Sequence, residues 1–323
     1  MRITKRPIHF AFIATLVVMF IYQGSLYCNE VHSQQMELKY KREIGSKGTA
    51  EGQFMSPHSL AVDDFGNIYV GDTGNNRIQK FSQNGTFLIG WGTAGSNDSQ
   101  FQGLHDIALD PKGKFVYTVE LKNHRVQEFY SNGTFISKWG YTGTGGRDTL
   151  RAPHQIAVNS KGIAYLTDRG GNQILKFYSN GTFIGTIGSK GTRPGQFAGP
   201  HGIAVDSNNN VYITDMQNSR VQVFDSNDTF IRQWGSFGNG TGQFSETAPG
   251  IAVDNDGHVF VIDKINSRVQ MFDMKGNYLA GWGTSGKDTE QLNKPEDIDV
   301  DNHCGIYITD TRNSRVQILD VVG

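Results

Sequence analysis

One segment recurs six times along this chain of 323 residues, and its period constrains the fold more than any other feature. The clearest copy reads PHGIAVD, at Pro200–Asp206. The other five copies begin at Pro57, Leu104, Pro153, Ala248 and Pro295. Successive copies lie 47 to 49 residues apart, so six equivalent units cover the chain from Gln53 to its end.

A second landmark follows each copy. It reads Asp-x-x-Asn-x-Arg in four units, begins with Glu in the second and is degraded in the third. The six triplets are Asp72/Asn75/Arg77, Glu120/Asn123/Arg125, Asp168/Gly171/Gln173, Asp215/Asn218/Arg220, Asp263/Asn266/Arg268 and Asp310/Asn313/Arg315. Because the acid ends one apolar run and the Arg begins the next, we expect a charge-assisted hydrogen bond across the turn. A feature repeated in nearly every unit indicates architecture rather than a ligand site.

Each unit holds four short apolar runs separated by polar or Gly-containing turns. In the fourth unit they span 202–206, 211–215, 220–225 and 229–234, and they are rich in Val, Ile, Tyr and Phe. Gly is abundant, at 40 residues, whereas no helix of useful length is predicted after residue 30. Four strands per unit at this period are typical of a propeller blade, so we predict an all-β, six-bladed β-propeller.

The two ends of the repeat region complement each other. The sixth unit stops at Gly323 after its third strand, and the missing fourth strand is present at the front, in 38–45. We therefore expect the N-terminal strand to complete the last blade. Such closure removes an open sheet edge that would otherwise favour aggregation.

These motifs resemble the NHL repeat family. The matching elements are P-x-G-I-A-V-D, a G-N-x-Y-x-x-D-like strand, N-x-R-V-Q-x-F and a final W-G, over about 285 of the 323 residues. The resemblance implies a propeller that binds other molecules. Relatives include RNA-binding and ubiquitin-ligase-linked domains, extracytoplasmic sensor domains and the related peptidyl-amidoglycolate lyase. Because one family supports such different roles, the site has to be argued from the residues themselves.

The N-terminal segment precedes the repeats and differs from them in composition. A short basic stretch, Met1–Pro7, is followed by a mostly apolar run to Tyr27 whose cleanest part, Phe10–Tyr22, is 13 residues long. We interpret 1–28 as a signal peptide or an N-terminal membrane anchor, 29–36 as a linker and 37–323 as the propeller. Either form of the leader predicts an extracytoplasmic location, secreted or membrane-anchored.

The second position of the repeated segment holds histidine in four of the six units, more often than any other repeated position in the chain. In the six units it reads His58, His105, His154, His201, Pro249 and Glu296. The first strand of each propeller blade lines the central channel, so these residues should ring one channel mouth. We call that side, which the Asp-x-x-Asn-x-Arg turns share, the top face. The four histidines and the glutamate are candidate ligands for Zn²⁺ or another divalent ion, although the residues define no obligatory cofactor. The alternative is that Pro-His is a packing unit copied with the blade.

The resemblance to the lyase divides these candidate ligands into two sets, because the zinc histidines of peptidyl-amidoglycolate lyase occupy this position on alternate blades. The two alternate sets here are His58 and His154 with Pro249 in place of a third ligand, and His105, His201 and Glu296. The resemblance also implies that Arg169, which follows Asp168, binds ligand. The loop that would hold the lyase's catalytic Tyr reads Glu120-Leu121-Lys122 and lacks one, so no catalytic residue is assigned.

Six N-x-S/T motifs are candidate glycosylation sites if the chain is exported. Their asparagines are Asn84, Asn97, Asn132, Asn180, Asn227 and Asn239. Four of them occupy the same turn, between the third and fourth strands, where Asn-Gly is also a preferred hairpin turn. That turn lies on the face opposite the histidines, so sugars there would leave the channel mouth open.

Composition and motifs together favour a binding function over a reaction. Acidic residues exceed basic ones by four in 29–323, which disfavours nucleic acid as a partner. The sequence predicts a monomeric, non-catalytic interaction module that binds a protein, peptide or glycan on its top face and meets the membrane only through its N-terminal segment. A metal-dependent lyase or hydrolase using the histidines is the alternative.

Overall fold

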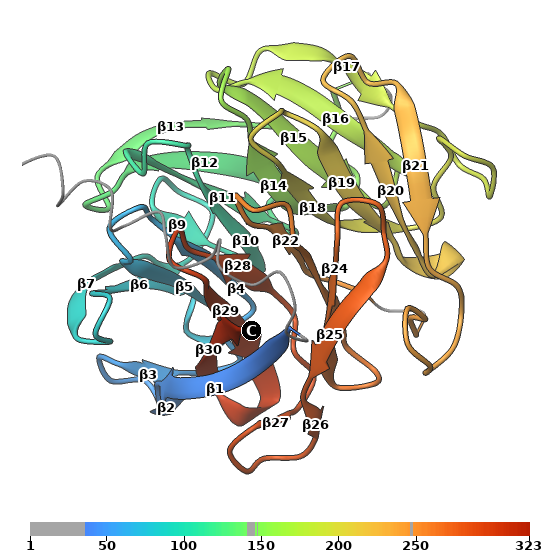
Figure 1. Ribbon diagram of the computed structural model, residues 1–323. Helices are drawn as coiled ribbons and strands as arrows, with labels where there is room; N and C mark the ends of the chain where they lie inside the picture. Colours follow the sequence, from blue (N-terminus) through green and yellow to red (C-terminus); the bar gives the residue numbers. More distant parts are fainter. Residues whose placement is uncertain (1–35, 141–145, 147, 246–247) are drawn as a thin grey trace, which may run out of the picture. The chain divides into compact units, whose positions relative to one another are not determined.

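The computed structural model describes residues 36–140, 146, 148–245 and 248–323. Over these ranges it contains six four-stranded antiparallel sheets arranged as the blades of a propeller (Figure 1). The first strands neighbour one another in the cyclic order β4, β10, β14, β18, β22, β28 and back to β4, which closes the ring. The prediction of a six-bladed all-β propeller is confirmed.

The blades repeat one plan, with the first strand at the channel and the fourth at the outside. Blade 1 consists of β4 (Ser59–Val62), β5 (Ile68–Asp72), β6 (Arg77–Phe81) and β7 (Phe87–Trp91), and blade 2 of β10 (Leu104–Leu109), β11 (Phe115–Glu120), β12 (Arg125–Tyr130) and β13 (Phe135–Trp139). Blade 3 consists of β14 (Pro153–Val158), β15 (Ile163–Asp168), β16 (Gln173–Tyr178) and β17 (Phe183–Ile187), and blade 4 of β18 (Pro200–Val205), β19 (Val211–Asp215), β20 (Arg220–Phe224) and β21 (Phe230–Trp234). Blade 5 consists of β22 (Ile251–Val253), β23 (Val259–Asp263), β24 (Arg268–Phe272) and β25 (Tyr278–Trp282), and blade 6 of β28 (Ile298–Val300), β29 (Gly305–Asp310), β30 (Arg315–Val322) and β1 (Glu37–Ile44).

The connections between strands contain short strands and 3₁₀ turns. Pairs of two-residue parallel strands lie in three connections between blades: β2 (Ser46–Lys47) with β3 (Gln53–Phe54), β8 (Thr93–Ala94) with β9 (Gln100–Phe101), and β26 (Thr284–Ser285) with β27 (Gln291–Leu292). Single 3₁₀ turns, η1 (Thr73–Asn75), η2 (Met216–Asn218) and η3 (Thr311–Asn313), join second to third strands. No helix within the described ranges is long and apolar enough to cross a membrane. The predicted leader, 1–28, and all but the last residue of the predicted linker lie outside those ranges.

The N-terminal strand completes the last blade, as expected. β1 pairs antiparallel with β30 from Glu37 opposite Val322 to Ile44 opposite Val316, with one irregularity between Tyr40 and Arg42. In Figure 1 the blue β1 lies beside the red β30. The first and last parts of the described chain therefore share one sheet, and β30 has no open edge.

Apolar side chains fill the spaces between neighbouring blades. Trp91, at the end of β7, packs against Phe129 of blade 2 with ring centroids 6.1 Å apart, and Trp139 packs against Phe177 of blade 3 at 4.6 Å. One residue of each connection between blades is fully buried at equivalent positions: Phe54, Phe101, Leu150, Phe197, Phe244 and Leu292. The core is thus distributed around the ring between blades rather than gathered at the centre.

The Asp-x-x-Asn-x-Arg turns are structural, as their repetition indicates. In blade 4, the fully buried carboxylate of Asp215 accepts hydrogen bonds from Arg220 Nε (2.8 Å), Asn218 Nδ2 (2.7 Å) and the backbone N–H of Ala198 (2.7 Å). Equivalent ion pairs join Asp72 to Arg77, Glu120 to Arg125, Asp263 to Arg268 and Asp310 to Arg315. Each ties the second strand to the third and to the preceding connection.

Candidate functional site at the channel mouth

Four histidines converge at the top-face mouth of the channel. His105, His154 and His201 lie near the starts of β10, β14 and β18, and His58 immediately precedes β4. Ring centroids are 4.2 Å apart for His58 and His105, 4.4 Å for His105 and His154, 4.5 Å for His154 and His201, and 5.3 Å for His105 and His201. His154 and His201 are buried, and the other two are half-buried.

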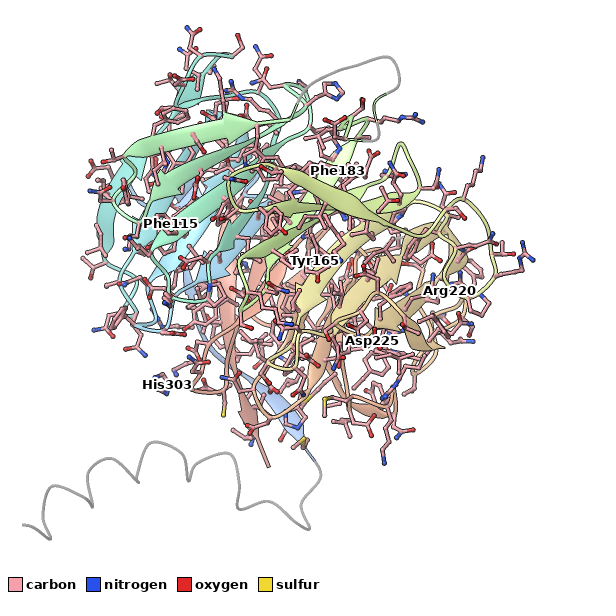
Figure 2. All side chains as sticks on the ribbon, turned by 90° about the horizontal axis from the view of Figure 1, so that it is seen from above. Phe115, Tyr165, Phe183, Arg220, Asp225 and His303 are labelled. Carbon is pink, nitrogen blue, oxygen red and sulfur yellow. The ribbon has the colours of Figure 1, made fainter. Side chains whose placement is uncertain are left out.

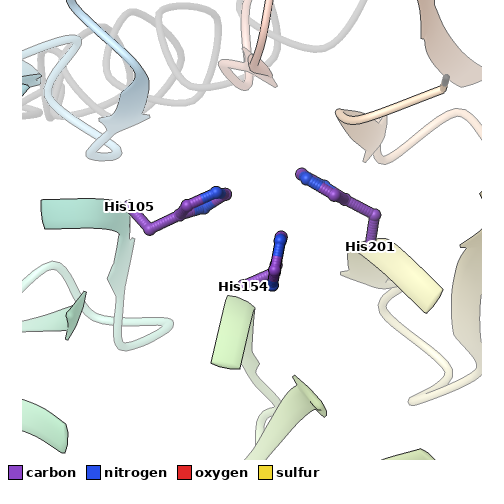
Figure 3. Close-up of side chains that lie close together, drawn as sticks. All are labelled: His105, His154 and His201. Atoms are coloured by element: carbon purple, nitrogen blue, oxygen red, sulfur yellow. The ribbon is translucent and has the colours of Figure 1, made fainter. Parts of the chain in front are cut away.

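Three of these histidines bring one ring nitrogen each close enough together to hold a metal ion. His105, His154 and His201 each offer a ring nitrogen, and the three nitrogens lie within 4.8 Å of one another. In Figure 3 the three rings point toward a common point from three separate strands. The group therefore comes from consecutive blades 2, 3 and 4 and cuts across the alternate-blade sets that the lyase resemblance implies.

Backbone carbonyls orient most of the rings. Nδ1 of His154 lies 2.9 Å from the carbonyl of Ala152, and Nδ1 of His201 lies 3.1 Å from the carbonyl of Pro249. Nδ1 of His58 lies 3.0 Å from the carbonyl of His105. Because a carbonyl can only accept, each of these Nδ1 atoms carries the proton, and Nε2 of a neutral ring keeps its lone pair. Pro249, the one apolar residue of the ring, contributes its carbonyl.

Burial keeps these imidazoles neutral. It lowers the pKa of His154 to about 4 and holds the pKa of His105 and His201 well below the usual value. Neighbouring imidazoles lower the pKa of His105 further, because a second positive charge in the cluster would be repelled. At neutral pH the cluster therefore presents unprotonated nitrogen donors.

Glu296 stands apart from the three-histidine group. Its carboxylate forms an ion pair with Lys264 of blade 5, and its Oε2 lies 3.7 Å from Nε2 of His58. Burial lowers the pKa of His58, and Glu296 opposes that shift. The five predicted metal ligands thus divide into the His105/His154/His201 group and a His58–Glu296 pair held by Lys264.

Arg169 is an exposed cation beside the cluster. Its charge acts on the pKa of both His154 and His201. Its guanidinium makes no hydrogen bond or ion pair with any residue in the described part of the chain. Blade 3 is also the one blade whose buried acid, Asp168, has Gln173 instead of an Arg partner, with Gln173 Nε2 3.4 Å from Asp168 Oδ2. In this blade the repeat lacks its internal Arg, and Arg169, which has no side-chain partner among the described residues, lies beside the histidines.

A second polar layer, which the repeat motifs did not predict, lies one residue further along the first strands. The backbone N–H groups of Ile156 and Leu60 donate to Asp106 and Asp297, and Gln155 Nε2 donates to Asp297 Oδ1 at 2.8 Å. Since Gln155 belongs to blade 3 and Asp297 to blade 6, this last bond crosses the channel. The only sequence signal was that this position varies while its neighbours repeat.

A cavity of about 230 Å³ is lined in part by Asp106, Gln155, Asp297 and Asp299. Burial raises the pKa of Asp297 and of Asp299 to about 7. Burial and the facing Asp297 raise the pKa of Asp106 well above its usual value. The inside of the channel therefore holds carboxyl groups that resist ionisation.

The candidate glycosylation sites are accessible. All six asparagines, Asn84, Asn97, Asn132, Asn180, Asn227 and Asn239, are exposed. Asn132 and Asn180 use their side-chain oxygen to accept the backbone N–H of the Thr two residues on, at 3.0 Å in each case. Exposure makes modification at these asparagines sterically feasible.

Ring closure, blade number and the channel-mouth cluster define this molecule as a six-bladed β-propeller with a polar top-face site. A family model described as NHL repeat matches residues 54–81 and 197–224. Two segments of this six-bladed propeller, in blades 1 and 4, therefore match the NHL repeat.

Curated relatives share segments of this chain. Human NHL repeat-containing protein 3 is 33% identical over 78 residues, which are 24% of this chain and 21% of that protein. Protein brain tumor of Drosophila melanogaster is 35% identical over 77 residues, 24% of this chain and 7% of that protein. The aligned region thus spans about a fifth or less of each relative.

Solved structures share the architecture at low sequence identity. A Bacteroides thetaiotaomicron protein of unknown function superposes with a TM-score of 0.65 at 15% identity, covering 89% of this chain and 77% of that one. Virginiamycin B lyase from Staphylococcus aureus superposes with a TM-score of 0.57 at 13% identity, covering 89% of this chain and all of that one. At these identities the likeness concerns the fold alone.

Proposed function

We propose that this protein is an extracytoplasmic, non-catalytic binding module that holds an acidic segment of a protein or peptide at the top-face channel mouth. NHL-repeat proteins generally bind proteins. The basic and apolar N-terminal segment supports export, because it has the composition of a leader or anchor.

One observation carries the proposed site. In five blades the turn Arg is neutralised by a buried acid, whereas the exposed guanidinium of Arg169 has no partner in the described chain. A guanidinium recognises a carboxylate through paired hydrogen bonds, and such charge-assisted bonds contribute about 1.5–3 kcal/mol. Arg169 beside a recessed ring of polar side chains is therefore suited to anchoring an acidic group.

Binding can be measured with two synthetic peptides, one acidic and one with Gln and Asn at the acidic positions. The full chain should bind the acidic peptide at least tenfold more tightly, and Arg169→Gln should remove about tenfold of that affinity. Arg312→Gln, which changes an exposed Arg on the corresponding turn of blade 6, is the control and should leave binding unchanged.

Equal binding of both peptides, or an unaffected Arg169→Gln variant, would contradict the proposal. A uronic-acid oligosaccharide that binds where the acidic peptide does not would overturn the ligand class. The location has its own assay: alkaline phosphatase fused to the C-terminus should be active in intact cells, because that enzyme matures outside the cytoplasm. An inactive fusion would refute export.

A metal-dependent lyase is the second candidate, favoured by the three converging imidazoles. Streptogramin B lyase and virginiamycin B lyase share the fold, and a histidine-to-alanine variant of the latter is catalytically inactive. Bound at the cluster, a metal ion would supply a Lewis acid or an activated water. His58 with Glu296 would be the proton acceptor beside it. Cleavage of a peptidyl-amidoglycolate that Arg169→Gln and His58→Asn both abolish would establish this function, and its absence at saturating metal would exclude that reaction.

A further inference from the structure

We propose that His105, His154 and His201, from three consecutive blades, form a binding site for one transition-metal ion of the Zn²⁺ class. This inference goes beyond the proposed binding function. It holds or fails whether or not an acidic peptide binds at Arg169.

The positions of the ring nitrogens carry the proposal. The three nitrogens lie within 4.8 Å of one another, and the rings converge from β10, β14 and β18 (Figure 3). Zinc–nitrogen bonds are about 2.0–2.1 Å long, so small rotations about the side-chain bonds would bring all three to a single ion. Among the described residues, the other group of this kind, Asp254, Asp256 and His258, is only partly buried.

Hydrogen bonding prepares two of the ligands. The Nδ1–H groups of His154 and His201 donate to the carbonyls of Ala152 and Pro249, which leaves Nε2 of each ring free to bind. A metal-bound histidine usually donates its other N–H to a carbonyl or carboxylate, which fixes the tautomer and the ring orientation. The sites of donation and of metal binding are therefore separated on each ring.

His105 supplies an independent indication. Its Nδ1 is buried and makes no hydrogen bond of normal geometry in the described part of the chain, and the backbone of His154 has only a minor effect on this ring. Buried polar atoms in folded proteins are nearly always paired, so an unpaired one needs an explanation such as an ion that the site normally holds. An ion between the three rings supplies a partner for this imidazole.

The donor set selects the kind of metal. Three neutral imidazoles without a carboxylate suit Zn²⁺, Cu²⁺, Ni²⁺ or Co²⁺, whereas Ca²⁺ and Mg²⁺ prefer oxygen donors. Glu296, the one nearby carboxylate predicted as a ligand, is already paired with Lys264 and directed at His58. Three protein ligands leave a coordination position for water or for an exogenous group.

The test uses the full chain purified without a histidine tag, stripped with a chelator and reloaded. Zn²⁺ measured by mass spectrometry after desalting should reach one equivalent, and Zn²⁺ should raise the thermal midpoint by about 5 °C or more. Co²⁺ should give the visible absorption of a nitrogen-ligated, low-coordinate ion. Wild-type protein that retains no Zn²⁺ and gives no Co²⁺ absorption would overturn the proposal without any reference to variants.

Matched variants locate the ion. His154→Gln and His201→Gln should each lower the affinity for Zn²⁺ at least a hundredfold, while circular dichroism reports whether the fold persists. His58→Asn, Glu296→Gln and His258→Asn should retain one equivalent, as should His303→Asn, which changes an exposed turn residue (Figure 2). Loss of the ion in Glu296→Gln or His258→Asn, with retention in a folded His154→Gln, would place the site elsewhere and refute the assignment.

Discussion

Arg220 and its counterparts are the residues on which each blade's top-face turn depends. Arg220 reaches the buried carboxylate of Asp215 at 2.8 Å and also donates to the carbonyls of Thr192, Arg193 and Gln196. It therefore neutralises a charge and fastens the preceding connection at the same time.

Truncating this Arg should be costly. Arg220→Ala leaves the Asp215 carboxylate buried without a counter-charge, and we expect a loss of about 3–5 kcal/mol in the free energy of unfolding. Urea unfolding followed by fluorescence measures it. Arg312→Ala, at an exposed site, should change stability by less than about 0.5 kcal/mol; a similar loss in both variants would contradict the structural role of the turn.

Asp297 should make stability depend on pH. Its pKa is raised to about 7, so between pH 4 and pH 7 the folded protein binds more protons than the unfolded chain at this group. This contribution favours the folded state at low pH and is lost as pH rises through 7. Asp297→Asn should therefore raise the thermal midpoint relative to wild type at pH 8 more than at pH 5. A difference that does not vary with pH would show that Asp297 ionises normally.

His154 should make the protein less stable as the pH falls, which is the opposite of the effect of Asp297. Because its pKa falls to about 4, the folded protein binds fewer protons than the unfolded chain between pH 4 and pH 6.5. The neutral cluster therefore loses stability as pH falls through this window. His154→Gln should be less sensitive than wild type to acidification from pH 6.5 to pH 4.5 in thermal melts. An equal or greater sensitivity in the variant would argue against a neutral, buried His154.

The channel-mouth residues show which features of the site could be predicted from the sequence. The repeat placed His58, His105, His154 and His201 at one channel mouth, and the structure brings them together there. The sequence repeat could not reveal that neighbouring blades lie close enough for the histidines of consecutive blades to form one group. The sequence also could not reveal that Lys264 of blade 5 forms an ion pair with Glu296. The histidine grouping and this ion pair both depend on distances between blades.

At the level of elements, each fourth strand ends where the chain turns to the next blade. Gly92 follows Trp91 at the end of β7 with φ +105°, and an added Cβ would lie 2.3 Å from Cε2 of Phe101, the buried residue of the connection. Trp-Gly therefore places a packing residue and a turn residue side by side. Sequence alone predicted the turn, and the structure adds the close approach of the aromatic ring.

Replacing glycine at this turn should destabilise the protein more than replacing glycine within a strand. Gly92→Ala forces a side chain into a left-handed conformation against Phe101, and we expect it to destabilise the protein by about 2–4 kcal/mol. Gly185→Ala, in β17 with no atom within 4 Å of the added Cβ, should be nearly neutral. Thermal melts of both variants compare them directly, and a neutral Gly92→Ala would contradict the contact.

The first strands explain why the missed polar layer exists. The inner edge of each blade leaves N–H groups facing the channel, and Asp106, Gln155 and Asp297 accept such groups from the following blade. An unpaired buried N–H is costly, so these side chains link neighbouring blades as well as lining the cavity. A sequence pattern shows polar residues there but not which edge they meet.

At the scale of the whole molecule, ring closure rests on β1. Deleting residues 1–45 removes this strand and exposes the edge of β30, so we expect concentration-dependent association. Deleting residues 1–35 retains β1 and should leave the protein monomeric. Light scattering over a range of concentrations separates the two outcomes, and a monomeric 1–45 deletion would show that the ring closes without β1.

The global fold was the most predictable level. Six copies with four strands each, and a spare strand at the front, define blade number and closure because the architecture repeats what the sequence repeats. The site was less predictable, since it depends on where the copies differ: Gln173 in place of Arg, Arg169 at the mouth, and Pro249 in place of His.

The most direct test is an anomalous-scattering map from crystals of the full chain grown with Zn²⁺, recorded on both sides of the zinc absorption edge. If blades 2, 3 and 4 bring their imidazoles to one ion, a single strong peak should lie about 2.0–2.1 Å from a ring nitrogen of each of His105, His154 and His201. A channel mouth without such a peak, or a peak held by Asp254 and His258 instead, would contradict the account.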